Sequence, residues 1–141
     1  MCCLVPEVLI YFVCKGALGS WGAALLAPYS DKSETSGFML STPQALAALV
    51  KQFWKDGWQV VRYCHTQLLR DLLNVILHQN IHCIGDRANK VVLDIFENIL
   101  EGDGVENLSE RRPRIEHAQI LQVRDLERAG RLGGPHSFSI F

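Results

Sequence analysis

Two histidines in similar local settings are the residues of this chain with the clearest chemistry. His82 lies in segment 80–89 (NIHCIGDRAN) and His117 in segment 114–119 (RIEHAQ). Each follows a β-prone run and precedes a loop and a helical pattern. Neutral imidazole is a good ligand for a borderline divalent ion such as zinc. Two histidines at the ends of neighbouring parallel strands can share one ion, as at the rim of a barrel.

The elements that must position these histidines alternate between strand and helix. Strand patterns cover residues 7–13, 58–60, 80–84 and 114–120. Helical periods cover residues 43–56, part of 61–79, 88–102 and 123–129, and Gly130 is expected to end the last helix. Alternation of this kind predicts an α/β fold with a parallel sheet. The segment 16–40 is rich in Gly and turn residues, so it is expected to be a long irregular loop.

One helix start is marked especially clearly by its sequence. Ser41 and Thr42 supply cap residues, and Pro43 takes the first helical position. Apolar residues then recur at helical spacing at Ala45, Leu46, Leu49, Val50 and Phe53. A second apolar face is predicted for the helix after His82, formed by Ala88, Val91, Val92, Ile95, Phe96, Ile99 and Leu100.

Length and composition limit the classes of function. The chain has 141 residues, whereas a closed (β/α)8 barrel typically needs about 250. The formal net charge of −1 and the lack of a basic stripe argue against nucleic acid as a partner. Five cysteines without a CxxC pair favour free thiols and a cytoplasmic location. The apolar opening is too short to span a membrane, so no membrane association is expected.

Several segments together resemble a known family. GALGS at 16–20, AALL at 23–26, PYSD at 28–31, DGWQV at 56–60 and the two histidine segments resemble the amidohydrolase superfamily, in its YtcJ-like metal-dependent branch. The match covers most of 16–60 and 80–133 in the same order. It implies an incomplete TIM (β/α)8 barrel containing strands four to six. It also implies hydrolysis of a carbon–nitrogen bond in a small amide-like substrate, with a divalent metal, zinc by default.

The resemblance also assigns roles to the two histidines. His82 is similar to the family's metal ligand at the end of the fifth strand, and His117 to the ligand at the end of the sixth. A metal held there can lower the pKa of bound water to about 7 and polarise the substrate carbonyl. The family's lysine on the fourth strand aligns with Tyr11, which cannot form a carbamate, and Lys15 takes the place of an aspartate. A lysine-bridged pair of metals is therefore not expected.

The remaining family ligands, a histidine pair on the first strand and an aspartate on the eighth, find no counterpart. We therefore expect a partial hydrolase domain over 1–141 that lacks a complete active site. Residues 61–79 are interpreted as a divergent insert in mid-strand, and 1–13 and 134–141 as divergent ends. A partial barrel exposes sheet edges, which favours self-association.

Two other functions remain open. The chain can be a non-catalytic fragment that acts as an interaction module. Alternatively, Gly16, Gly19 and Gly22 can belong to an open nucleotide-binding domain, although their spacing is GxxGxxG and no prompt helix follows.

Other polar residues near the two histidines are given structural roles. Asp86 and Arg87 are expected to cap the following helix and tie down a loop. Glu116 is expected on the opposite side of its strand from His117, because side chains alternate. His65, His78 and His136 are interpreted as incidental, with a break from helix to strand between His78 and His82.

Overall fold

The computed structural model describes residues 8–14, 16–55, 77–103 and 114–133. Its elements are β1 (Val8–Cys14), a 3-10 turn (Leu18–Ser20), α1 (Pro43–Lys55), β2 (Leu77–Cys83), α2 (Asp86–Asp103), β3 (Arg114–His117) and α4 (Val123–Gly133). The predicted alternation of strands and helices is confirmed, and 16–40 is a long loop containing only the 3-10 turn. The predicted strand at 58–60 and most of the proposed insert lie outside the described residues.

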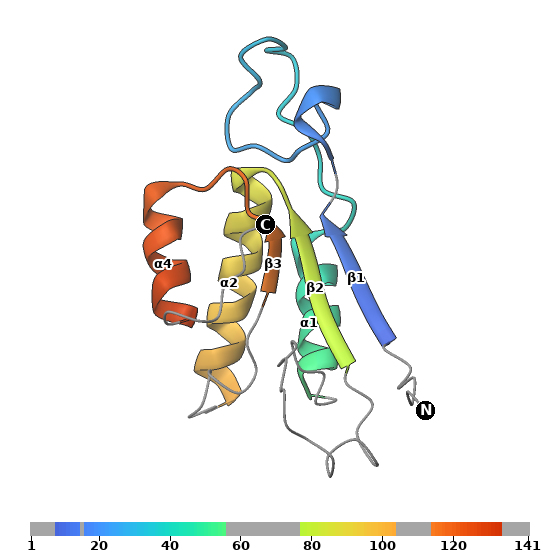
Figure 1. Ribbon diagram of the computed structural model, residues 1–141, viewed down its shortest axis with the longest axis vertical. Coiled ribbons are helices and arrows are strands. Elements are labelled where there is room, and N and C mark those ends of the chain that lie inside the picture. The colour runs from blue at the N-terminus through green and yellow to red at the C-terminus, as the bar shows by residue number, and fades with distance from the viewer. Residues whose placement is uncertain (1–7, 15, 56–76, 104–113, 134–141) are drawn as a thin grey trace, which may run out of the picture.

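The three strands form one parallel sheet in the order β1-β2-β3. Its register places Val13 opposite His82 and His82 opposite Glu116, with Cys83 opposite His117. All three strands point toward the same end, where the loop 16–40 lies (Figure 1). The carboxyl ends of the strands, and with them both histidines, therefore meet beneath this loop.

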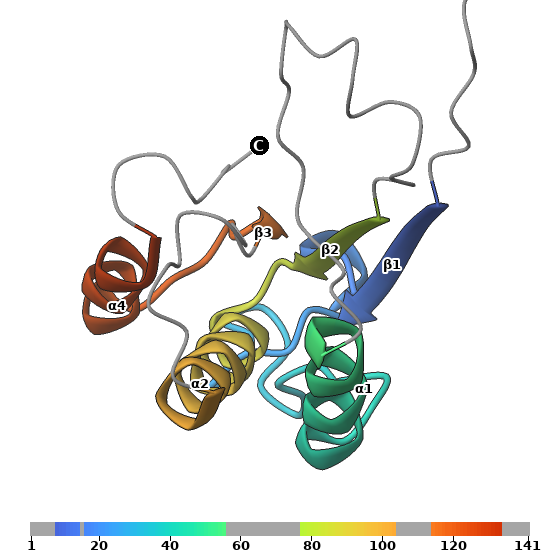
Figure 2. The ribbon, with the colours of Figure 1, turned by 90° about the horizontal axis from the view of Figure 1, so that it is seen from below.

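Helices α1 and α2 cover one face of the sheet, and α4 lies beside α2 (Figure 2). The core between these layers holds buried apolar residues from both helices and the strands, among them Leu46, Val50, Trp54, Ile81, Cys83, Val92, Leu93, Phe96, Ile99 and Ile115. The predicted apolar face of α2 is confirmed. In α1, Leu46 and Val50 are buried as expected, but Leu49 is 45% exposed and Trp54 is buried instead.

Several predicted boundaries need correction. The start of α1 is confirmed, since Pro43 is its first residue and Thr42 Oγ1 accepts from Ala45 N at 3.2 Å. β2, however, begins at Leu77, so the predicted break between His78 and His82 is wrong. The last three residues assigned to the insert, 77–79, belong to this strand. They pair with 8–10 of β1, because a continuous ladder satisfies their backbone groups.

Two later elements also differ in length from the prediction. β3 ends at His117 rather than Ile120, because His117 and Ala118 leave the extended conformation. α4 runs to Gly133, so Gly130 does not end it. Glycine is tolerated inside a helix at a modest cost, and here the packing of Ala129 and Leu132 keeps the helix intact.

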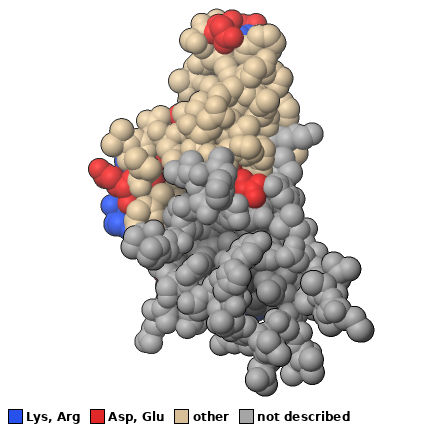
Figure 3. All heavy atoms as spheres, in the orientation of Figure 1, with Lys and Arg blue, Asp and Glu red and all other residues tan. Residues whose placement is uncertain are grey.

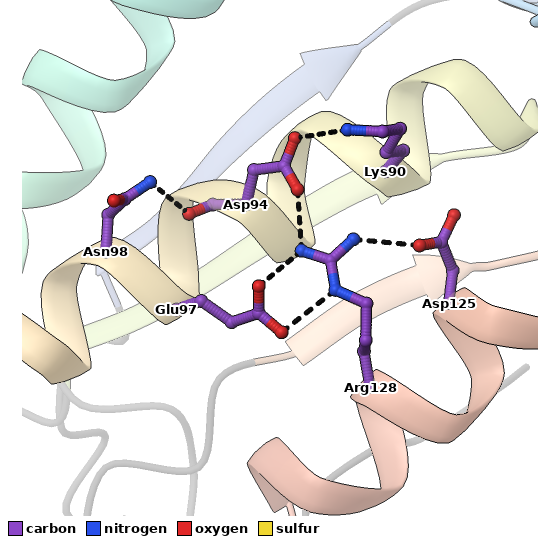
Figure 4. Close-up of polar contacts among 6 residues, drawn as sticks. All are labelled: Lys90, Asp94, Glu97, Asn98, Asp125 and Arg128. Atoms are coloured by element: carbon purple, nitrogen blue, oxygen red, sulfur yellow. Dashed lines mark hydrogen bonds and ion pairs between the residues drawn. The ribbon is translucent and has the colours of Figure 1, made fainter.

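An ion-pair network joins α4 to α2 (Figure 4). The Arg128 guanidinium donates to both Glu97 oxygens at 2.9 and 2.5 Å and to Asp94 Oδ1 at 2.6 Å. It also donates to Asp125 Oδ1 at 2.8 Å, within its own helix. Because Asp125 is fully buried and the Arg128 side chain is only 14% exposed, this network fixes how α4 docks.

The described surface carries few charged side chains in the view of Figure 3. They gather at the tip of the upper loop and at the left edge, and a further acidic group lies near the centre of this face, beside the grey atoms. No helix among the described residues is long and apolar enough to cross a membrane.

Candidate functional site

The structure brings the two predicted site residues into contact at the carboxyl end of the sheet. His82 is the penultimate residue of β2 and His117 is the last residue of β3. Their ring centroids lie 4.2 Å apart with an interplanar angle of 68°, an edge-to-face arrangement. His82 is half-buried and His117 is exposed, so the pair opens toward solvent.

Strand alternation alone does not explain this contact. His117 stands opposite Cys83 in the register, and Cys83, Ile81 and Ile115 are buried on the helix-covered face. A regular strand would carry His117 to that face and away from His82. Instead, the backbone turns at His117 (φ 70°) and Ala118 (φ 40°), both in the left-handed region. This bend brings the His117 ring to His82.

The same bend corrects the expectation for Glu116. This residue was expected to lie away from the metal side of its strand. It stands opposite His82 in the register, and its charge acts on His82. Glu116 and the turned His117 ring therefore both lie near His82.

The electrostatic setting of His82 favours a neutral ring. Burial lowers the pKa of His82 below its usual value, and the nearby His117 ring lowers it further. The carboxylate of Glu116 acts in the opposite direction but does not reverse the shift. At neutral pH the His82 imidazole therefore keeps a nitrogen lone pair free of its proton, the form that binds metal.

The donor set fits part of a metal site. Two imidazoles in contact at one rim are suitable ligands for zinc or a similar ion, and such sites usually take about three protein ligands plus water. Within the described ranges, no group of three or more His, Cys, Asp or Glu side chains is placed to hold a metal ion. Among the described residues, His82 and His117 are the imidazoles at this rim that could take part in such a set.

Asp86 and Arg87 have the structural roles predicted for them. Asp86 Oδ1 accepts from Arg87 N and from Leu26 N, both at 2.9 Å, which caps α2 and attaches the loop 16–40. Asp86 Oδ2 accepts from Gln122 Nε2 at 2.7 Å. The Arg87 guanidinium donates to the Gly37 carbonyl at 2.8 Å. These bonds hold the loop at the rim where the histidines meet.

The glycines of this region permit close backbone packing. A Cβ on Gly85 would lie 2.1 Å from the Ala24 carbonyl oxygen, and one on Gly16 would lie 1.8 Å from the Gly22 carbonyl carbon. Gly16 also has φ 137°, which other residues rarely adopt. Gly16 and Gly22 are therefore explained by the fold of the loop itself. Tyr11 lies in β1 opposite Asn80, and Lys15 lies outside the described residues.

Three features of the site were missed in the sequence: the left-handed pair at His117 and Ala118, the contribution of Gln122, and the bonds of Asn89. Asn89 is fully buried, and its side chain bonds to both loops that follow the histidine strands. A polar residue four positions into an apolar helix pattern is the only sequence signal for it. The left-handed pair has no signal, since neither residue is glycine.

Two known proteins are similar to most of this chain in sequence. No protein-family model matches the chain. LONG AFTER FAR-RED 3 of Arabidopsis thaliana is 32% identical over 117 residues, 83% of this chain and 16% of that protein. YtcJ of Bacillus subtilis (strain 168), named as an amidohydrolase, is 29% identical over 117 residues, 83% of this chain and 17% of that protein.

Two solved structures share the fold. An uncharacterized metal-dependent hydrolase from Pyrococcus horikoshii OT3 matches with a TM-score of 0.65 and 27% identity, over 93% of this chain and 21% of that one. A second, from Pyrococcus furiosus, matches with a TM-score of 0.61 and 25% identity, over 87% and 20%. This chain therefore spans about a sixth of the curated relatives and a fifth of these structures. It is a partial homologue of the YtcJ amidohydrolase, with metal-dependent hydrolases as its structural neighbours.

Proposed function

We propose that this chain forms part of a metal-dependent hydrolase in which His82 and His117 bind one divalent cation. The observation that carries the proposal is the contact between the two rings, 4.2 Å apart at the ends of adjacent parallel strands. The neutral His82 and the likeness to metal-dependent hydrolases support it. Zinc is the default ion for imidazole ligands.

The fold we propose is an incomplete (β/α)8 barrel containing strands four to six, with the whole chain 1–141 as one partial domain. The support for this fold is that three parallel strands lie in sequential order with the described helices on one face, as in part of the wall of such a barrel (Figure 2). In such barrels the site lies at the carboxyl ends of the strands. Both histidines occupy that end here.

The proposed reaction is hydrolysis of a carbon–nitrogen bond in a small amide-like molecule. A divalent metal at such a site supplies a bound water of lowered pKa and polarises a carbonyl oxygen. His82 and His117 would hold and orient the ion through ring nitrogens. The loop 16–40, tied to Asp86 and Arg87, would form one wall of the site and limit access of water. The support for this substrate class is the likeness to a named amidohydrolase.

We further propose that the other ligands come from a fuller form of the protein, because the described residues supply only two. A small-molecule substrate is the partner expected for that form, and a cytoplasmic location is proposed with it. The alternative is a non-catalytic fragment that binds other chains through its sheet edges. The observation that favours this alternative is that the outer strands β1 and β3 pair only with β2 among the described residues.

Equilibrium dialysis against zinc tests the metal proposal. We expect the wild-type chain to retain measurable zinc, bound weakly because its two imidazoles are only part of a ligand set, and His82→Ala and His117→Ala each to lose most of it. His136→Ala serves as the matched control, because that residue lies outside both motifs, and it should retain zinc like the wild type. Equal zinc retention in all four proteins, or none in any, would contradict the proposal.

A further inference from the structure

The loops that follow β2 and β3 are joined at one buried side chain. Asn89 Nδ2 donates to the Ile120 carbonyl at 2.9 Å, in the loop after β3. It also donates to the Gly85 carbonyl at 3.0 Å, in the turn after β2, with a longer contact to Ile84 O at 3.4 Å. Three carbonyl oxygens around this atom identify it as the amide nitrogen.

A backbone hydrogen bond reinforces the same junction. Ile120 N donates to Ile84 O at 2.9 Å, so the two loops are paired next to the Asn89 side chain. His82 lies two residues before Ile84, and His117 lies three residues before Ile120. The junction therefore fixes the short segments that carry both rings.

The segment between His117 and this junction is strained. His117 and Ala118 have φ values of 70° and 40°, which L-residues with a side chain rarely adopt. Such a conformation persists only where the surrounding structure holds it in place. The described contacts around this segment include the burial of Ala118 in the core and, two residues further along, the Asn89 bond to Ile120 and the Ile120 bond to Ile84.

We infer that Asn89 is a positioning residue that holds the His117 ring against His82 by clamping together the loops after β2 and β3. Asn89 would thereby form the two-histidine pair before any metal binds. The functional meaning of this role rests on the proposed metal site. Among the described contacts of Asn89, none is with either ring, so it acts through the backbone. Its amide donors are required, because all three neighbouring groups are acceptors.

The decisive variant is Asn89→Asp, which keeps the size of the side chain and replaces the amide donors with oxygen acceptors. The matched control is Asn98→Ala on the same helix, because exposed Asn98 donates to Asp94 O, one turn earlier, and to no other described residue. Ile99→Ala serves as a second control, since it removes buried volume about 15 Å along α2 from Asn89. It separates lost stability from lost positioning.

The first measurement needs no metal. In the full chain, NMR should show a nuclear Overhauser effect between the ring protons of His82 and His117, because their centroids lie 4.2 Å apart. We expect the effect to survive in Asn98→Ala and Ile99→Ala and to vanish in Asn89→Asp, with all spectra recorded well below each protein's unfolding temperature. An undiminished effect in folded Asn89→Asp overturns the inference. If Asn89→Asp does not fold, Asn89→Ser, whose shorter side chain cannot reach Ile120, takes its place.

The second measurement adds Co²⁺ as a probe and records its visible spectrum during titration. We expect Asn89→Asp to bind Co²⁺ at least about 10-fold more weakly than wild type, the usual effect of losing a group that orients a metal ligand. Both controls should bind like wild type. Unchanged Co²⁺ affinity in Asn89→Asp counts against the inference. Should wild type bind no Co²⁺ while the ring contact still depends on Asn89, the proposed function fails and the positioning role stands.

Discussion

His117 and Ala118 hold a backbone conformation that is costly for residues with side chains, and they hold it at the candidate site. The left-handed region costs roughly 1–2 kcal/mol per residue for L-amino acids other than glycine. Here the bend reverses the direction that strand alternation would give to His117. The strain therefore has a specific result, the contact between the two imidazoles.

The strain at Ala118 predicts an unusual response to glycine. Ala118→Gly should leave the free energy of unfolding within about 0.5 kcal/mol of wild type, because relief of about 1 kcal/mol of strain offsets the buried methyl group. Ala88→Gly, at a buried helical position, should cost about 1.5–2 kcal/mol. Urea denaturation of both variants makes the comparison. Equal losses at the two positions would mean that Ala118 carries no strain.

The histidines themselves could be predicted from sequence, because each follows a β-prone run and lies in a family-like motif. Their contact could not be derived from local rules. Alternation assigns His117 to the face of Ile115, and the residues that leave the strand, His117 and Ala118, are not glycines. The hydrogen bond from Asn89 to Ile120 could not be predicted either, because the two residues are 31 positions apart in the sequence. Asp86 and Arg87 could be predicted, because capping is a local property of the turn.

At the scale of elements, the docking of α4 on α2 depends on Arg128. Its pKa is raised, chiefly by the hydrogen bonds that it donates to Glu97, and then by those that it donates to Asp125 and Asp94, against the effect of burial. Asp125 is fully buried beneath it, whereas Asp94 and Glu97 are partly exposed. The isolation of the buried Asp125 carboxylate is therefore the costliest consequence of losing Arg128, and the partly exposed pairs with Glu97 and Asp94 contribute less each.

Removing the arginine should leave a buried carboxylate without its partner. We expect Arg128→Met to lower the free energy of unfolding by about 2–4 kcal/mol, and the further change Asp125→Asn to recover part of that loss. Lys90→Met, which breaks an exposed pair with Asp94, should cost at most about 0.5 kcal/mol. Denaturant unfolding of these variants decides between the two roles. Similar small losses for Arg128 and Lys90 would contradict the account.

The same network makes stability depend on acid. Hydrogen bonds from Arg128 lower the pKa of Glu97 below its usual value of 4.5. Burial raises the pKa of Asp94, but the hydrogen bonds from Lys90 and Arg128 outweigh burial, so this pKa lies below its usual value of 3.8. A carboxylate with a lowered folded pKa stabilises fully above its unfolded pKa, and this stability is lost as pH falls through the folded value. Thermal unfolding should therefore become easier on acidification below about pH 4.5, and less steeply so in Arg128→Met. Identical pH profiles of thermal unfolding for the wild type and Arg128→Met would exclude a coupling between Arg128 and these two carboxylates.

The predicted and observed ends of α4 differ at Gly130. The sequence placed it at the end of the last helix, but it lies within α4, and a Cβ there meets nothing within 4 Å. Gly130→Ala should therefore raise the free energy of unfolding by about 0.5–1 kcal/mol. A left-handed terminal glycine would instead make the same change costly. Helix continuation could not be predicted here, because packing of Leu132 outweighs local propensity.

At the scale of the whole molecule, the described sheet has outer strands β1 and β3 that pair only with β2 among the described residues. Unpaired backbone groups at a sheet edge favour pairing with another chain. The parallel order of the strands could be predicted from the alternation of elements, whereas the start of β2 at Leu77 could not. The residues 77–79 resemble a helical continuation until their pairing with β1 is known.

The edges of β1 and β3 that are unpaired among the described residues predict that copies of this chain associate with one another. Light scattering after size exclusion should give a mass above the 15.8 kDa of one chain, rising with protein concentration. The association should persist in high salt, because backbone pairing and apolar contact drive it and the net charge is only −1. A mass of one chain at all concentrations would show that the edges are covered within the monomer.

The claim on which the functional account depends is that His82 and His117 bind one metal ion together. Crystals of the full chain grown with zinc, with diffraction recorded at the zinc absorption edge, test it most directly. We predict an anomalous peak about 2.0–2.1 Å from a ring nitrogen of each histidine. A peak bound to only one of them, or zinc bound only elsewhere in the molecule, would contradict the account.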